Sequence, residues 1–292
     1  MNTDRTISWR ELWDRTASQT GRAEARWLCE EASGSFGDEF LEVVDDAASE
    51  RSVAHLDEML ARLQTGEPLQ YVLGHWSFRR LDLLVDKRVL IPRPETELVA
   101  EHAIALVRQL VAEGVERPFV VADLGTGSGA IGLSLAAELP RGLVEVWLTD
   151  RSADALDVAR ANAAGLGMAG GCVRFGLGDW YAALPVELHG NLALVVSNPP
   201  YIARDDAQIE AVVREWEPHA ALFADGNGLA DVSVVVNGAV DWLMVGGWLV
   251  SEIDSSQGDV VRELLTSAGL AQVEILRDLT GRDRIAVGRR VS

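Results

Sequence analysis

Short apolar runs alternate with helical patterns from residue 93 to residue 292. A strand that is followed by an amphipathic helix usually returns to the same sheet in the same direction, so this alternation predicts a mostly parallel sheet with helices on both faces. Only the tight segment TGRD separates the last two runs, which we therefore expect to form an antiparallel hairpin. Seven strands are predicted, within residues 119–139, 143–150, 172–180, 192–201, 247–254, 272–279 and 284–290.

The first 75 residues contain helical patterns instead. Ser8 and Glu11 have the spacing of a capping box, and the helix that they begin is expected to end near Gly21. Apolar residues repeat at helical spacing in three further segments, which indicates a small bundle of four or five helices. Packing and partner recognition are both open as roles for this bundle. Residues 76–92 alternate at period two, which is typical of a β-hairpin or an extended connector.

Composition limits the classes of partner. The 292 residues carry a formal net charge of −19, with Lys87 as the only lysine and with arginines scattered among acids. Nucleic-acid binding draws much of its affinity from clustered basic side chains, so a protein or small-molecule partner is favoured. No apolar run is long enough to cross a bilayer, and the first residues lack the apolar stretch of a secretion signal. Two separated cysteines, Cys29 and Cys172, favour a reducing cytosol over a disulfide framework.

A glycine-rich segment, VVADLGTGSGAIG, joins the first predicted strand of the sheet to a helix. Gly125, Gly127 and Gly129 allow positive φ values and let the backbone approach a ligand closely. The string also satisfies the dinucleotide fingerprint G-x-G-x-x-G, which runs from Gly127 to Gly132. A P-loop is excluded because no Gly-Lys-Ser/Thr follows. A dehydrogenase and a methyltransferase are both compatible with this loop.

Acidic residues at the strand ends distinguish these two classes. Asp150 closes the second strand, where a carboxylate can accept hydrogen bonds from both ribose hydroxyls; the alternative is a helix N-cap, which Ser152 could also provide. Asp123 would repel a pyrophosphate but can bond to the amino acid portion of a ligand. Asp179 and Trp180, in the GDW that ends the third strand, could accept the exocyclic amine of adenine and cover its ring, with a core tryptophan as the alternative. Together these residues favour the adenosine pocket of a methyltransferase.

The segment SNPPY follows the fourth strand, at the edge where ligands bind in open α/β sheets. The side-chain oxygen of Asn198 and the carbonyl of Pro199 are two acceptors for the two N–H donors of a planar amino group. Such acceptors favour a pyramidal nitrogen, whose lone pair can attack a sulfonium methyl group. Pro199 and Pro200 keep the segment rigid, and Tyr201 can stack on the flat substrate. Adenine N6, cytosine N4 and a carboxamide are all possible methyl acceptors, whereas a simple proline turn would need neither Asn198 nor Tyr201.

The chain resembles the release-factor glutamine methyltransferases over nearly its whole length. The blocks GEPLQYVLGHWSF and VLIPRPETELV are similar to the connector of that family. The blocks DLGTGSGAIG, SNPPY, EWEPHAALFADGNGL and DLTGRDR follow in the family's order. SNPPY is shared with DNA and RNA amine methyltransferases, whereas IPRPETE together with EPHAAL is far more specific.

This resemblance implies a fold, an activity and a set of site residues. The fold is a class I S-adenosylmethionine-dependent methyltransferase domain (Rossmann-like) at 93–292, a β-hairpin connector at 76–92 and a helical bundle at 1–75 that helps engage the release factor. The activity is transfer of a methyl group from S-adenosylmethionine to N5 of the glutamine in the Gly-Gly-Gln motif of peptide chain release factors, which modulates translation termination and leaves S-adenosylhomocysteine. From the motifs and the resemblance together, the expected cofactor-binding residues are Asp123, Gly125, Thr126, Gly127, Ser128, Gly129, Asp150, Asp179, Trp180 and Asn198. The expected catalytic residues are Asn198, Pro199, Pro200 and Tyr201.

Residues around the expected site are given structural rather than catalytic roles. Arg93, Glu95 and Glu97 are expected to order the connector beside the pocket, with a surface salt-bridge cluster as the alternative. Glu217 and Pro218 are expected to shape the mouth of the substrate site, although a loop anchor would have the same sequence.

Two other functions are open. An adenine N6 methyltransferase acting on nucleic acid would need an electropositive surface or a target-recognition domain, and a cofactor-binding module without catalysis would not need the SNPPY segment. We therefore expect a cytoplasmic, monomeric enzyme whose partners are release factors, with no stable binding of nucleic acid and no membrane association. No metal is expected, because the histidines are dispersed: His55, His75, His102, His189 and His219.

Overall fold

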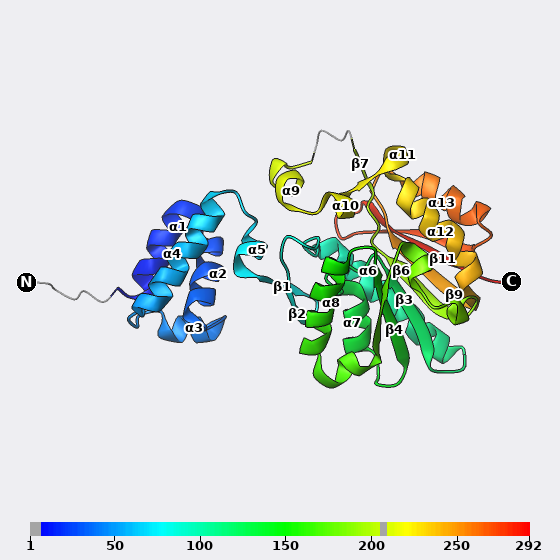
Figure 1. The fold of residues 1–292 in the computed structure, drawn as a ribbon, viewed down its shortest axis with the longest axis horizontal. Coiled ribbons are helices and arrows are strands. Elements are labelled where there is room, and N and C mark those ends of the chain that lie inside the picture. Colours follow the sequence, from blue (N-terminus) through cyan, green and yellow to red (C-terminus); the bar gives the residue numbers. More distant parts are fainter. Residues whose placement is uncertain (1–6, 205–208) are drawn as a thin grey trace, which may run out of the picture. The chain divides into compact units, whose positions relative to one another are not determined.

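The computed structural model describes residues 7–204 and 209–292, which fold into two compact units, Met1–Gly74 and His75–Ser292. Figure 1 labels the helices and strands of each unit. The β-hairpin predicted for the connector belongs to the second unit. Residues 1–6, which the sequence analysis assigned to the bundle, lie outside the described residues.

The first unit is a helical bundle, as predicted, around an aromatic centre. Trp9 and Trp13 pack edge-on against Phe40, with ring centroids 6.3 and 5.9 Å away. Leu12 and Leu28 complete this core and are fully buried. The helices are α1 (Trp9–Thr20), α2 (Arg22–Ser33), α3 (Asp38–Val43), α4 (Glu50–Gln64) and α5 (Leu69–Leu73).

The predicted capping box at the start of α1 is confirmed. The Ser8 hydroxyl accepts a hydrogen bond from the backbone N–H of Glu11, and the Glu11 carboxylate accepts one from the N–H of Ser8 at 3.0 Å. The helix ends at Gly21, whose N–H donates to the carbonyl of Ala17. Two backbone donors that a free helix end would leave unpaired are therefore satisfied within the sequence itself.

Removing the Ser8 hydroxyl tests this cap. We expect Ser8→Ala to lower the free energy of unfolding of the first unit by about 1 kcal/mol, because the N–H of Glu11 loses its acceptor. Urea denaturation followed by circular dichroism measures the change. Ser18→Ala, at an exposed position in the same helix, is the matched control and should change stability by less than about 0.5 kcal/mol. Equal effects of the two substitutions would contradict the capping role.

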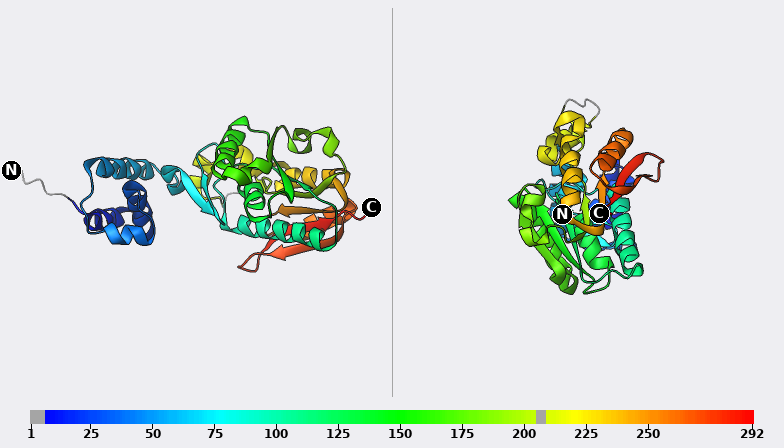
Figure 2. Two further views of the ribbon diagram at one scale, coloured as in Figure 1. Left: turned by 90° about the horizontal axis from the view of Figure 1, so that it is seen from below. Right: turned by 90° about the vertical axis from the view of Figure 1, so that its right-hand side faces the viewer.

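The second unit is built on a seven-stranded sheet in the order β10-β11-β9-β6-β3-β4-β5. The five strands from β9 to β5 are parallel, with β3 at their centre. β11 runs antiparallel to both β9 and β10, which confirms the predicted C-terminal hairpin; Figure 2 shows these last strands in orange and red. The strands are β3 (Phe119–Leu124), β4 (Val144–Asp150), β5 (Val173–Leu177), β6 (Leu192–Ser197), β9 (Leu243–Glu252), β10 (Ala271–Arg277) and β11 (Asp283–Arg289).

One of these strands ends earlier than the sequence predicted. β5 stops at Leu177 rather than at Trp180, because Trp180 has a φ of 46° and begins the 3₁₀ helix η2 (Trp180–Ala183). β6 ends at Ser197, in keeping with the prediction that the segment with Asn198 and the two prolines follows this strand, because prolines have no N–H to donate to a neighbouring strand.

Helices cover both faces of the sheet, as predicted (Figures 1 and 2). α6, α7 and α8 pack on one face, and α12 and α13 close a separate apolar core on the other. None of the helices in the described ranges is long and apolar enough to cross a bilayer. The helices are α6 (Pro94–Ala112), α7 (Ala130–Glu138), α8 (Ala153–Gly165), α9 (Ala211–Trp216), α10 (His219–Leu222), α11 (Asp225–Gly228), α12 (Ala230–Trp242) and α13 (Gly258–Ser267), with the further 3₁₀ helices η1 (Gly167–Cys172) and η3 (Val186–Leu188).

Two short strand pairs lie outside the main sheet. β1 (His75–Phe78) and β2 (Leu81–Leu84) form the predicted hairpin, and β7 (Ile202–Ala203) pairs with β8 (Phe223–Ala224). In the hairpin turn, the Arg79 guanidinium donates to both oxygens of Glu138 at 2.7 and 2.9 Å, and the Arg79 N–H donates to Glu97. The hairpin is thereby fastened to α7 and α6.

Candidate active site

A pocket opens at the carboxyl ends of the parallel strands, and its walls belong entirely to the second unit. Strand-end residues, the glycine loop and the segment just before α6 line it. Within the described residues, nine of the ten expected cofactor-binding residues line this pocket: Asp123, Gly125, Thr126, Gly127, Ser128, Asp150, Asp179, Trp180 and Asn198. Gly129 is the exception: it is the N-cap residue of α7 and does not line the pocket.

The glycine loop has the backbone conformation that the sequence predicted. Gly125, Gly127 and Gly129 all have positive φ values, of 70°, 55° and 89°. A Cβ atom on Gly125 would lie 3.3 Å from the Trp180 ring, and one on Gly129 would lie 2.8 Å from the side chain of Leu133. Glycine at these two positions therefore lets the loop turn sharply, with Trp180 on one side and α7 on the other.

Asp123 is the most deeply buried charged group of the pocket, at 1% exposure. Its Oδ2 accepts hydrogen bonds from the Thr126 hydroxyl at 2.7 Å and from the Gly132 N–H at 2.9 Å. Its Oδ1 has no hydrogen-bond partner among the described residues. Burial raises the pKa of Asp123 to about 6, against the two hydrogen bonds, which lower it. A buried carboxylate oxygen without a partner is suited to a cationic or N–H donor of a ligand.

Asp150 closes β4 and faces the same pocket. Its two oxygens accept the backbone N–H groups of Gly127 and Ser152, at 3.0 and 2.9 Å. Ser152 itself caps α8, since its side chain accepts the N–H of Ala155, so Asp150 is not the N-cap of that helix. Burial raises the pKa of Asp150, and the two backbone donors oppose this shift. Each of its oxygens keeps a second lone pair for a ligand hydroxyl.

One end of the pocket combines an indole ring with two acids. Trp180 is half-buried, Asp179 is exposed, and Asp231 from α12 also lines the wall. Burial raises the pKa of Asp231, while Arg151 and a hydrogen bond with Trp180 lower it. Asp231 was not predicted from the sequence, because an acid in the first turn of a helix is commonly explained by the helix N-terminus alone.

The segment after β6 brings Asn198 and Pro200 to the pocket wall. The amide nitrogen of Asn198 donates to the hydroxyl of Thr96 at 3.3 Å. Within the described residues, Pro199 and Tyr201 are not part of the pocket lining, so the stacking role of Tyr201 stays a prediction. The Tyr201 hydroxyl instead donates to the carboxylate of Glu252 at 3.1 Å, and burial raises the pKa of that hydroxyl.

Thr96 and Glu252 are residues of this site that the sequence analysis did not identify. Thr96 lies inside the block IPRPETE, between Glu95 and Glu97, and of these three residues only the two acids were assigned a role in ordering the connector. Glu252 is the single acid in the otherwise uncharged run GWLVSEI, and a charge at the end of a buried strand is a signal that could have been used.

An ion pair between a half-buried arginine and a buried glutamate lies beside the pocket. Glu217 is 3% exposed and accepts both the guanidinium of Arg93, at 2.5 Å, and the N–H of Ile91, at 3.1 Å. Pro218, the next residue, lines the pocket. The pair joins the segment before α6 to the segment after α9, so Glu217 anchors one of these segments to the other.

Comparison with known proteins identifies the class of this fold and site. Residues 102–237 match the family model described as "Methyltransferase small domain", and residues 14–74 match the one described as "PrmC N-terminal domain". A parallel sheet with an antiparallel last strand pair, a glycine loop and an acid after the next strand agree with the first match. The second unit is therefore a methyltransferase domain, which confirms the predicted class I methyltransferase fold.

Sequence relatives narrow the class to one family. Proteins named release factor glutamine methyltransferase are similar to this chain in Xylella fastidiosa (strain 9a5c), with 44% identity over 83% of this chain and 82% of the relative, and in Burkholderia pseudomallei (strain K96243), with 40% identity over 94% and 93%. The protein of that name in Escherichia coli (strain K12) is 34% identical over 94% of each chain. The chain belongs to the release factor glutamine methyltransferase family, which confirms the resemblance found in its motifs.

The raised pKa of Asp123 predicts a characteristic dependence of stability on pH. A carboxyl group whose pKa is raised in the folded state stabilises the fold while it is protonated, and this contribution is lost as the pH rises from about 4 through about 6. Asp123→Asn keeps an oxygen for Thr126 and Gly132 and cannot ionise. We expect this variant to match the wild type near pH 4 and to be more stable by up to about 3 kcal/mol above pH 7. Urea denaturation at several pH values measures the difference, and a constant difference across this range would contradict the assignment.

Proposed function

We propose that this protein transfers a methyl group from S-adenosylmethionine to the side-chain amide nitrogen of the glutamine in the Gly-Gly-Gln motif of peptide chain release factors. The observation that carries the proposal is the position of Asn198, on the wall of the same pocket that contains Asp123 and Asp150. One pocket thus holds two carboxylates, of Asp123 and Asp150, that suit the methyl donor, beside the Asn198 side chain, whose oxygen suits the amino group to be methylated. The names of the relatives support the choice of glutamine over adenine or cytosine.

The residues of the pocket fit the chemistry of this cofactor. The unpaired oxygen of Asp123 suits the ammonium group of its amino acid portion, and the carboxylate of Asp150 suits ribose hydroxyls. The Trp180 ring, held against Gly125, offers an apolar face to adenine, and Asp179 offers an acceptor for its amine. When bound, the cofactor supplies a methyl group activated by a positively charged sulfur.

Asn198 and Pro199 would act on the methyl acceptor. The nitrogen of a carboxamide is a poor nucleophile, because its lone pair is delocalised into the carbonyl group. The side-chain oxygen of Asn198 and the carbonyl oxygen of Pro199 would accept hydrogen bonds from the two N–H groups of this nitrogen. These two hydrogen bonds favour a pyramidal nitrogen with a localised lone pair. Pro199 and Pro200 restrict the backbone, so these acceptors need little reorganisation during transfer. The nitrogen becomes cationic as the new N–C bond forms, and its proton can then leave to water without a strong base.

The same proposal covers the partner and the compartment. We propose that the helical bundle at 1–75 helps engage the release factor, in line with its match to the PrmC N-terminal domain. The net charge of −19 and the motifs favour a protein partner over stable binding of nucleic acid. The free thiols of Cys29 and Cys172 are in keeping with a reducing cytosol, and we propose that the enzyme acts there as a monomer.

A transfer assay with competing acceptors tests the proposed function. The full-length protein is incubated with tritiated S-adenosylmethionine and, in separate reactions, with a purified bacterial release factor, DNA and RNA. We expect label on the release factor, located at the Gly-Gly-Gln glutamine by mass spectrometry and absent when that glutamine is replaced by alanine. Label on nucleic acid alone would support the adenine alternative instead, and cofactor binding with no transfer to any acceptor would support a binding module.

Two substitutions separate catalysis from cofactor binding. Asn198→Ala removes an acceptor that acts on the transition state, so we expect kcat to fall by about 100-fold or more while the Kd of S-adenosylhomocysteine changes less than about fivefold. Asp150→Ala should raise that Kd by about 10-fold or more, because hydrogen bonds to a carboxylate are lost. Calorimetry measures the Kd of S-adenosylhomocysteine, and the tritium assay measures kcat. Asn191→Ala, at an exposed position before β6, is the matched control; parallel losses of kcat and affinity in Asn198→Ala would argue against its acceptor role.

A further inference from the structure

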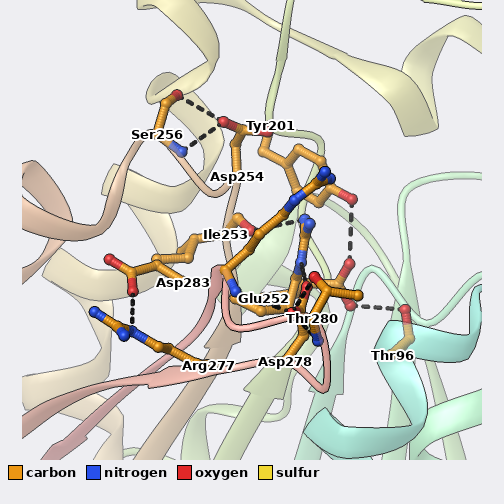
Figure 3. Close-up of polar contacts among 12 residues, drawn as sticks. Thr96, Tyr201, Glu252, Ile253, Asp254, Ser256, Arg277, Asp278, Thr280 and Asp283 are labelled. Carbon is orange, nitrogen blue, oxygen red and sulfur yellow. Dashed lines mark hydrogen bonds and ion pairs between the residues drawn. The ribbon is translucent and has the colours of Figure 1, made fainter.

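Glu252 has no role in the function proposed above, although it is a buried charge at the end of β9. Its side chain is 1% exposed and lies outside the pocket lining within the described residues. Figure 3 shows its carboxylate between two hydroxyl groups. One oxygen accepts the Thr96 hydroxyl at 2.7 Å, and the other accepts the Tyr201 hydroxyl at 3.1 Å. Burying a charge is costly even where hydrogen bonds offset part of the cost, which raises the question of a task that a neutral side chain would perform less well.

The hydrogen bond between Thr96 and Glu252 determines the direction of the hydrogen bond between Thr96 and Asn198. A threonine hydroxyl has one proton, and Thr96 donates it to a carboxylate, which can only accept. Towards Asn198 the Thr96 oxygen can therefore offer only a lone pair. The side chain of Asn198 must face it with the amide nitrogen, as the 3.3 Å contact shows. The oxygen of the same planar amide then points away from Thr96.

We propose that Thr96 and Glu252 are positioning residues that fix the orientation of the Asn198 amide, so that its oxygen rather than its nitrogen is presented to the methyl acceptor. This inference rests on the proposed function, since it explains how that function obtains its acceptor oxygen. The second oxygen of Glu252 binds the hydroxyl of Tyr201, which belongs to the same turn. One carboxylate therefore orients both ends of the NPPY segment.

The chemistry of the carboxylate explains why a neutral residue would serve less well. A glutamine at 252 could present either its oxygen or its NH₂ group to Thr96, and in the second case Thr96 would donate to Asn198 and reverse its amide. Burial raises the pKa of Glu252 above its ordinary value. The hydrogen bonds of Thr96 and Tyr201 and the charge of Arg284 oppose this shift, because each of them favours the ionised, acceptor-only form. The positive charge of Arg284, on β11, thus favours the acceptor-only form of Glu252.

Substitutions at Thr96 test the inference in the full-length protein. Thr96→Val keeps the shape and removes the hydroxyl, so the Asn198 amide can take either orientation. We expect kcat for the release factor to fall by about 10- to 100-fold, with the Kd of S-adenosylhomocysteine changed less than about twofold. Thr96→Ser keeps the hydroxyl and should stay within about threefold of the wild-type kcat, and Glu252→Gln should lose activity as Thr96→Val does. Thr266→Val, which removes an exposed hydroxyl on α13, is the matched control.

A merely structural role would give a different pattern. If Thr96→Val turns over at the wild-type rate, if Thr96→Ser is as impaired as Thr96→Val, or if kcat and cofactor affinity fall together, the positioning role is wrong. If the wild type labels nucleic acid rather than the release factor, the proposed function fails, while the ratio of Thr96→Val to wild type on that acceptor still measures the positioning effect.

A spectroscopic measurement makes the test independent of transfer altogether. The side-chain NH₂ resonances of Asn198 can be assigned by their loss in Asn198→Ala. We expect these resonances to shift in Thr96→Val and to return towards their wild-type positions in Thr96→Ser. Unchanged resonances in Thr96→Val would overturn the inference.

Discussion

The carboxylate of Asp123 closes the turn on which the methyltransferase site is built. One of its oxygens takes the hydroxyl of Thr126 and the N–H of Gly132, and these two bonds join the end of β3, the glycine loop and the first turn of α7. A side chain at Gly132 would crowd this turn, since a Cβ there would lie 2.2 Å from the side chain of Leu148 and 3.0 Å from Oδ2 of Asp123. The second oxygen has no hydrogen-bond partner among the described residues and, under the proposed function, is available to the cofactor. A single buried charge therefore shapes the loop and equips the pocket.

Neighbouring strands extend this arrangement along the sheet edge. Asp150 at the end of β4 ties down the loop at Gly127, and Asn198 follows β6 on the other side of β3. Because parallel strands all end at the same edge, three polar groups that are far apart in the sequence meet in one pocket. Their partners are backbone N–H groups and the hydroxyls of Thr96 and Thr126 rather than long flexible side chains. The site is consequently organised before any ligand arrives, which is the condition for efficient electrostatic stabilisation.

Much of this organisation could be predicted from local patterns. The alternation of strands and helices gave the parallel sheet, and glycines at fixed spacing gave the loop, because both patterns express backbone constraints that act over a few residues. Asp150 and Asn198 were found because a strand end is a local signal. Glu252 also lies at a strand end, but this signal was not used. Thr96 could not be found in this way, since its contact with Glu252 joins α6 to β9 across 156 residues. The left-handed conformation of Trp180 was missed for a related reason: tertiary packing against Gly125, not local preference, favours it.

The orientation of Asn198 also bears on damaged substrates. Under the proposed function, the acceptor oxygen on the pocket wall attracts the NH₂ group of glutamine and repels a carboxylate. A release factor whose glutamine has been converted to glutamate by spontaneous deamidation would meet oxygen against oxygen at this wall. The enzyme would then methylate only release factors that still carry the intact amide. A methylated release factor would therefore be one whose glutamine had not been deamidated.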